Sequence, residues 1–268
     1  MVIDLTPKAG FPLQIDTQSL EVRAGGGISF ELQPRLVDEI RPVLFETDSL
    51  PSGMPFYWNY KLVQAGSADQ LFQGKRLTFG LVLLPALKAG AEYVKTHGHY
   101  HSCMPGSQIA YPEVYTHYYG ELYLLMQRRD QGRALELDDC VLYRMVPGKS
   151  IMVPPGYAHI LINPSLKPAL MGGLYSLDSI HDYAPIRAAA GGAYFFIEEA
   201  GLEKFLPNRR YTRNPPLQLI SDPAGTRFAP PDESQPLWQS FAAEPQRYAF
   251  ITDPVMARRQ FLPEDQRQ

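Results

Sequence analysis

Apolar and aromatic residues recur through the middle of the chain in short runs that turn residues interrupt. The segments 56–63 and 77–84 are rich in aromatic and β-branched side chains, which favour strands. Further short strands are expected at 93–101, 113–127, 134–145, 150–153, 159–163, 169–175 and 193–198. Turn signals such as Pro147-Gly148 separate them. The pattern predicts an all-β jelly-roll barrel whose mouth can hold one ligand.

The two ends of the chain carry different patterns. The segment 33–45 has apolar residues at helical spacing, interrupted by Pro42, and predicts one short helix. Beyond Gly201 closely spaced prolines replace the alternation, so an extended, wrapping segment is expected there. We therefore expect an N-terminal arm with a short helix at 1–50, the barrel at 51–200 and a proline-rich extension at 201–268.

The composition agrees with this architecture and limits the kinds of partner that the chain is expected to bind. The 268 residues include 25 prolines, 21 glycines and 16 tyrosines, which suit many short strands joined by turns. Charged residues make up 20% and the net charge is -3, so nothing predicts nucleic acid or an anionic membrane as a partner. Neither a signal peptide nor an apolar stretch of about 20 residues is found, which favours a cytoplasmic protein. Cys103 and Cys140 are expected to be free thiols.

The histidines predict a metal site. All six lie between His97 and His181, and His99 and His101 are two apart, so on a strand they share one face. A lone histidine is more often structural, but this pair is followed by Glu113 and His159. Three neutral nitrogens and one carboxylate oxygen suit a divalent first-row ion and leave a coordination position open. The barrel is therefore expected to carry one metal per chain.

The spacing of these residues resembles that of the cupin superfamily. The second half of the pattern places Gly148, Pro154, Gly156, His159 and Asn163 at the cupin intervals. The first half keeps the His-x-His pair, and Gly120 follows the glutamate. Eleven residues, 102–112, separate the pair from the glutamate where three or four are usual, so a loop is expected at the barrel mouth.

Further motifs resemble one family, the cupin-type phosphoglucose isomerases first known from archaea. These motifs are Lys95-Thr96-x-Gly98-His99-Tyr100-His101, Glu113-Val114-Tyr115, Val153-Pro154-Pro155-Gly156-Tyr157-Ala158-His159, Tyr175 and His181-Asp182-Tyr183. The resemblance covers about residues 81–201. It implies a double-stranded β-helix barrel, reversible conversion of glucose 6-phosphate to fructose 6-phosphate in glycolysis and gluconeogenesis, and a homodimer. It also implies a divalent metal, with Fe2+ expected first and Mn, Ni or Zn as alternatives.

The resemblance also implies roles for individual residues. The metal ligands are His99, His101, Glu113 and His159, and the catalytic groups are Glu113, Tyr115 and His181. The substrate contacts are Thr96, His97, Gly98, Tyr175 and Tyr183. Two family positions for phosphate contacts differ here, because His97 replaces a lysine and Val82 replaces a threonine.

The reaction itself needs a group that moves a proton between two carbons and a charge that stabilises the oxygens. Glu113 is placed as ligand, as base or as both, and a hydride shift between the carbons is the competing route. On the same strand face, Tyr115 is expected either as a proton relay or as a core residue. The changes at His97 and Val82 leave two alternative functions. One is isomerisation or epimerisation of a non-phosphorylated sugar or sugar acid, and the other is non-catalytic sugar binding.

Overall fold

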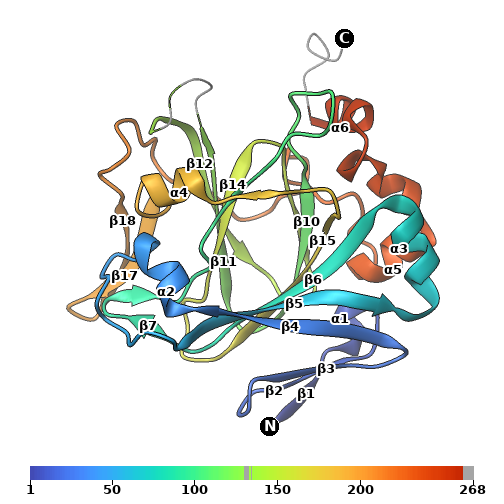
Figure 1. The fold of residues 1–268 in the computed structure, drawn as a ribbon, viewed down its shortest axis with the longest axis horizontal. Helices are drawn as coiled ribbons and strands as arrows, with labels where there is room; N and C mark the ends of the chain where they lie inside the picture. Colours follow the sequence, from blue (N-terminus) through green and yellow to red (C-terminus); the bar gives the residue numbers. More distant parts are fainter. Residues whose placement is uncertain (130–132, 134, 262–268) are drawn as a thin grey trace.

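Two β-sheets face each other and form the barrel of the computed structural model, which describes residues 1–129, 133 and 135–261 (Figure 1). The larger sheet has the strand order β13-β10-β15-β6-β5-β4. Its strands are Ser150–Val153, Glu113–Tyr119, Ala169–Ser176, Leu77–Leu84, Pro55–Ala65 and Ile28–Leu36. The smaller sheet, in the order β14-β11-β12-β19, has the strands Tyr157–Ile162, Leu122–Arg129, Leu137–Met145 and Gln218–Ile220. The predicted all-β barrel is confirmed.

Three smaller sheets surround the barrel. One follows the order β18-β17-β8-β7, with the strands Leu202–Pro207, Tyr194–Glu199, Glu92–Tyr93 and Lys88–Ala89. Another pairs β16 (His181–Asp182) with β9 (Tyr100–His101). The third contains β1, β2 and β3 at Val2–Asp4, Leu13–Asp16 and Glu21–Ala24.

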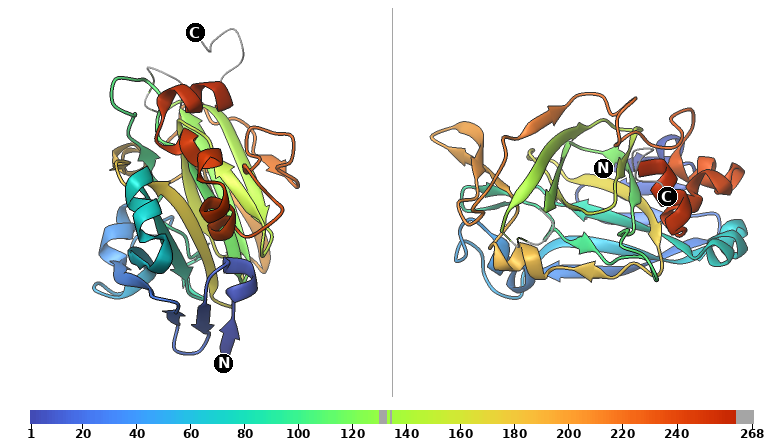
Figure 2. Two further views of the ribbon diagram at one scale, coloured as in Figure 1. Left: turned by 90° about the vertical axis from the view of Figure 1, so that its right-hand side faces the viewer. Right: turned by 90° about the horizontal axis from the view of Figure 1, so that it is seen from above.

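Helices are short and lie outside the barrel (Figure 2). The α-helices are α1 Thr6–Ala9, α2 Val37–Ile40, α3 Asp69–Lys75, α4 Ala184–Ala188, α5 Leu237–Ala243 and α6 Pro254–Phe261. The 3-10 helices are η1 Arg41–Val43, η2 Gly66–Ala68 and η3 Pro245–Ile251. Within the described ranges, no helix is long and apolar enough to cross a bilayer.

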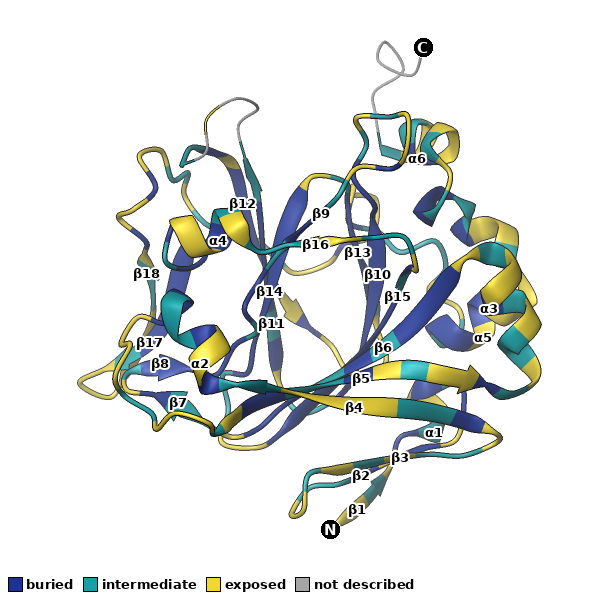
Figure 3. Cartoon of the chain, in the orientation of Figure 1, coloured by how far each residue is buried: buried dark blue, intermediate teal, exposed yellow. Residues whose placement is uncertain are grey.

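Strand β6 is covered on both faces of the large sheet (Figure 3). Phe79, Leu81 and Leu83 alternate with Thr78, Gly80 and Val82 along this strand. The first set packs on the outer face against Trp238 and Phe241 of α5. The second set faces the barrel interior, where it lines a cavity. One strand therefore supplies both a packed core and a binding surface.

The helix expected at 33–45 is wrong over its first part. Residues 33–36 belong to β4, which pairs with β5 along its whole length, and only α2 and η1 follow. Pro34 is tolerated because β4 is the edge strand of its sheet, where one side needs no ladder hydrogen bonds. The division into arm, barrel and extension stays a prediction, although β4 and β19 both pair with barrel strands from outside the range 51–200. Residues 262–268 of the extension lie outside the described residues.

Candidate metal and substrate site

Four side chains converge at the barrel interior. Glu113 begins β10 of the large sheet, and His159 lies in β14 of the small sheet. His101 belongs to β9, and His99 forms a bridge with His159 just before it. One ligand atom from each of the four residues lies within 4.8 Å of the others. The four predicted ligands are therefore brought together, although they come from three separate segments of the chain.

The cluster has the polarity of a cation site. Nε2 of His159 and Oε1 of Glu113 are 2.8 Å apart, yet among the described residues both atoms lack a hydrogen-bond partner. Nε2 of His99 and Nε2 of His101 are 3.2 Å apart. Buried polar atoms without partners are costly, and lone pairs that face each other repel. A divalent cation among these atoms would satisfy all four, so the residues fit a metal ion.

Electrostatics favour the protonation states that a metal needs. Burial, and after it the neighbouring His159, lowers the pKa of His99 well below its ordinary value. Burial likewise lowers the pKa of His101. Burial would raise the pKa of Glu113, but His159 and His101 hold it down to about 2. Imidazole nitrogens beside an ionised carboxylate are a donor set that binds divalent ions.

The loop that lengthens the first cupin motif orients one ligand. Nδ1–H of His101 donates to the Tyr111 carbonyl at 2.7 Å, which leaves Nε2 free to point at the cluster. Tyr111 and Met104 from this loop are buried in the core outside the large sheet. Cys103 is exposed and lies outside the cluster, and Cys140 is also a free thiol. Part of the long loop is therefore packed in the core and holds the His101 ring in its orientation.

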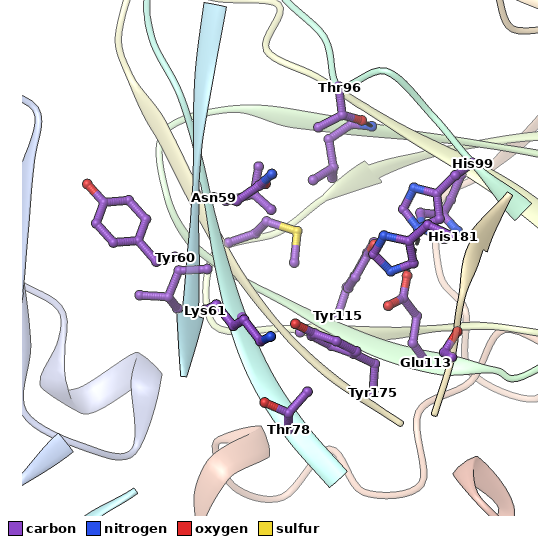
Figure 4. A pocket seen from close by; sticks show the side chains of 18 of the residues that line it. Asn59, Tyr60, Lys61, Thr78, Thr96, His99, Glu113, Tyr115, Tyr175 and His181 are labelled. Carbon is purple, nitrogen blue, oxygen red and sulfur yellow. Dashed lines mark hydrogen bonds and ion pairs between the residues drawn. The ribbon is translucent and has the colours of Figure 1, made fainter. Parts of the chain in front are cut away.

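A cavity of about 310 Å³ opens beside the cluster. Its lining on the large sheet consists mainly of alternate residues, which are Gln33, Arg35, Tyr57, Asn59, Lys61, Thr78, Gly80, Val82, Met171, Gly173, Tyr175, Glu113 and Tyr115. His99, Glu113 and His181 lie on one side of the cavity, and Asn59 and Lys61 lie on the opposite side (Figure 4). Glu113 is the acidic residue among the lining side chains. The cavity is large enough for a small polar ligand that reaches the cluster.

Two glycines keep the cavity floor open. Gly173 pairs with Tyr115 on one side and with Gly80 on the other. A Cβ on Gly173 would lie 2.8 Å from Cδ1 of Tyr115, and a Cβ on Gly80 would lie 3.2 Å from Cε1 of Tyr175. Both tyrosine rings therefore lie across backbone that has no side chain. This arrangement needs glycine at Gly173, where the approach is closest.

The predicted catalytic neighbours also line the cavity. The His181 ring stacks on His99, with ring centroids 3.9 Å apart. Burial, and after it His101, lowers the pKa of His181 to about 4. Burial raises the pKa of Tyr115 well above its ordinary value, and the Glu113 carboxylate adds to this effect. Burial, followed by Glu113, also raises the pKa of Tyr175 to about 12. Uncharged imidazole and phenol groups can exchange protons or hydrogen bonds with a bound sugar.

The predicted substrate contacts are divided between two cavities. Thr96, Tyr175 and Tyr183 line the cavity beside the cluster. His97 instead lines a neighbouring cavity of about 340 Å³, where its Nδ1 lies 2.9 Å from the Gly98 carbonyl. Gly98 has a φ of +77°, and a Cβ there would come within 2.4 Å of Ile160. The roles predicted for His97 and Gly98 therefore stay predictions, and the structure gives Gly98 a backbone role.

Sequence reasoning missed the polar side chains of β4 and β5. Arg35, Asn59 and Lys61 line the cavity, but none of them belongs to a recognised motif. The predicted strand at 56–63 contained a signal, because Tyr57, Asn59 and Lys61 share one face by alternation. Arg35 carried no such signal, since its segment was expected to be helical.

A family model for glucose-6-phosphate isomerase (GPI) matches residues 46–215. The chain belongs to the glucose-6-phosphate isomerase family. The glucose-6-phosphate isomerase of Thermococcus litoralis is 35% identical to this family member over 126 residues, which cover 47% of this chain and 59% of that protein. The one from Pyrococcus abyssi is 33% identical over 135 residues, which cover 50% and 65%. The chain thus spans less than two thirds of the length of these curated relatives.

Solved structures similar to this GPI family member include an oxalate oxidase in complex with glycolate and the vicilin of hazelnut, Corylus avellana. The first has a TM-score of 0.32 and 16% identity, and covers 48% of this chain and 55% of that chain. The second has a TM-score of 0.34 and 10% identity, and covers 59% and 36%. Similarities of this extent carry no conclusion about function.

Proposed function

We propose that this protein is a metal-dependent aldose–ketose isomerase that interconverts glucose 6-phosphate and fructose 6-phosphate. The observation that carries the proposal is the cluster of His99, His101, Glu113 and His159, whose buried ligand atoms face one point in a chain of the GPI family. The same proposal includes Fe2+ as the native ion, with Mn, Ni or Zn as alternatives. A cytoplasmic location and a homodimer complete it.

The side chains around the cavity have different roles in the proposed reaction. A bound divalent ion supplies positive charge that stabilises the oxygens of the reacting carbons. The Glu113 carboxylate faces the same point and is the group that accepts a proton from one carbon and returns it to the other. Tyr115 orients this carboxylate, and His181 moves the hydroxyl proton when the sugar ring opens. Glu113 and Tyr115 are buried, whereas His181 is exposed to solvent.

Proton transfer by Glu113 and a direct hydride shift give different isotope patterns. The reaction is run in deuterated water, and the product is examined by mass spectrometry and NMR. Deuterium at the carbon next to the carbonyl supports proton transfer, because the abstracted proton exchanges with solvent. A product without deuterium there would assign the step to a hydride shift and remove the role of Glu113 as base.

One assay tests the proposed function. The purified protein is stripped of metal, reloaded with Fe, Mn, Ni or Zn, and offered glucose 6-phosphate and fructose 6-phosphate beside free glucose, mannose and their acids. Interconversion of the two phosphates by at least one metal form is the expected result. If every metal form leaves both phosphates unchanged, the proposal is wrong.

A second candidate function is isomerisation or epimerisation of a non-phosphorylated sugar or sugar acid. It is favoured by the apolar Val82 in the cavity lining and by His97, which lines the neighbouring cavity instead. Turnover of a free sugar or its acid in the same assay, without turnover of the phosphates, would establish it.

A further inference from the structure

We infer that Arg35, on the edge strand β4, holds the phosphate of the substrate. The inference rests on the proposed function, because it assumes a phosphorylated sugar in the cavity. Arg35 and Lys61 are the lysine and arginine side chains among the described residues that line this cavity. Arg35 lies before the range 46–215 that the family model matches, so the comparison with the GPI family assigns it no role.

The loop at 95–98 supplies no free cation to the cavity. Lys95 is buried, and its ammonium is bound to the Glu92 carboxylate at 2.6 Å and to the Val43 carbonyl at 2.7 Å. His97 faces the neighbouring cavity. Thr96 does line the cavity, but its hydroxyl already accepts the Leu161 N–H at 3.0 Å. A dianionic phosphate beside this loop therefore needs its positive charge from another element.

Arg35 lies at a suitable distance from the metal cluster. Its guanidinium carbon is 5.6 Å from the Tyr183 ring, and that ring is 5.3 Å from the His99 ring. One aromatic ring thus separates the cation from a predicted metal ligand. A sugar whose carbonyl end lies at the cluster can extend past Tyr183 and bring its terminal phosphate to the guanidinium.

The guanidinium is oriented before any ligand binds. Nη2–H donates to the Tyr183 hydroxyl at 3.1 Å, and Nη1–H donates to Oε1 of Glu39 at 2.8 Å. Glu39 lines only the neighbouring cavity, whereas Arg35 lines both. The carboxylate therefore lies behind the guanidinium as seen from the site. Three of the five N–H donors of an arginine remain for the phosphate oxygens.

Lys61 is the competing cation. It lies on β5 and is exposed, and its ammonium makes no hydrogen bond or ion pair within the described part of the chain. Its flexible ammonium would have to be ordered by the ligand, and that ordering costs side-chain entropy. Arg35 is half-buried and already held by two partners, so it loses less on binding. The structure favours Arg35, and the two residues can be tested separately.

The test uses the full chain loaded with metal, with two readouts. KM and kcat are measured for fructose 6-phosphate, and the dissociation constant of inorganic phosphate is measured by calorimetry. Arg35→Gln is expected to raise both KM and the phosphate dissociation constant about 10- to 100-fold, because a charge-assisted hydrogen bond is lost. The kcat should change much less than KM, and Arg35→Lys should recover part of the loss.

Matched variants separate binding from folding. Arg23→Gln breaks an arginine–glutamate pair on β3, remote from the cavity, and should leave both readouts unchanged. Glu39→Gln removes the ion pair behind Arg35 but keeps the guanidinium, and should retain phosphate binding. Equal losses in Glu39→Gln and Arg35→Gln would show a structural role and overturn the inference. The inference is also overturned if Lys61→Gln weakens phosphate binding and Arg35→Gln does not.

The two proposals fail in different ways. If no metal form turns over fructose 6-phosphate while Arg35→Gln still loses phosphate binding, the isomerase function is wrong and the phosphate site stands. If the wild type isomerises the sugar phosphates and Arg35→Gln keeps its KM and phosphate affinity, the function stands and the role of Arg35 is wrong.

Discussion

Gly173→Ala is expected to disturb the site from the floor of the cavity. The new Cβ would lie 2.8 and 2.9 Å from Cδ1 and Cε1 of Tyr115, whereas ordinary contacts begin at 3.4 Å. The ring must therefore retreat by roughly half an ångström in a buried site, an overpacking that costs about 1–3 kcal/mol. Tyr115 cannot move freely, because its ring lies edge-on to His159 at 5.4 Å.

The neighbouring Gly172 provides a matched control on the other face of the same strand. A Cβ there would lie 2.7 Å from both Cε1 of Phe79 and the Tyr118 hydroxyl, in the core outside the barrel. Both alanine variants should lower the melting temperature by about 3–10 °C. Only Gly173→Ala should also lower kcat, by about 10-fold, because it displaces Tyr115 from Glu113.

The assays are thermal unfolding followed by circular dichroism, and steady-state kinetics of the metal-loaded enzyme. The comparison of the two variants decides the outcome. An equal loss of kcat in Gly172→Ala would mean that the effect passes through general destabilisation. Unchanged stability and kcat in Gly173→Ala would show that Tyr115 moves at no cost, and either result would refute the argument.

Three further predictions concern the metal, the extension and pH. His159→Ala should contain no bound metal by elemental analysis, and a chelator should no longer lower the melting temperature of this variant. The wild type, in contrast, should be stabilised by about 4 kcal/mol when the metal is present at 1,000 times its dissociation constant. Trp238→Ala should lower the free energy of unfolding in urea by about 3–5 kcal/mol, because the Trp238 ring packs against Phe11 at 4.6 Å and Phe79 at 5.3 Å. A smaller decrease would mean that the C-terminal extension adds little to the core. Hydrogen bonds, chiefly from Ser234, lower the pKa of Asp232, so its contribution is present above about pH 4 and is lost as pH falls. Asp232→Asn should therefore unfold at lower urea than the wild type at pH 7, and a gap of equal size at pH 3 would contradict this reasoning.

Local periodicity was enough to predict several features of the site. Residues two apart on a strand share a face whatever the strand pairs with, so the pairing of His99 with His101 follows from sequence alone. Spacing and the family resemblance added Glu113 and His159, and the structure brings both into the same cluster.

Other features depended on partners far away in the chain. The segment 33–36 has helical spacing, but nine residues of β4 pair with β5 and make it a strand. That pairing turns Arg35 toward the cavity, while His97, between Thr96 and Gly98 in the sequence, lines the neighbouring cavity. No pattern within either segment predicts this outcome, because strand pairing is a long-range choice.

Strand periodicity and motif spacing were enough to predict the all-β barrel, the cluster of possible metal ligands and the family of the chain. The set of side chains that lines the cavity depended instead on contacts between distant parts of the chain. Gly173 and Gly80 lie side by side only because β15 pairs with β6, and Arg35 meets Tyr183 only because an edge strand and a turn far apart in the sequence close over one cavity. Those contacts follow from how distant elements pack, and packing is a property of the whole fold.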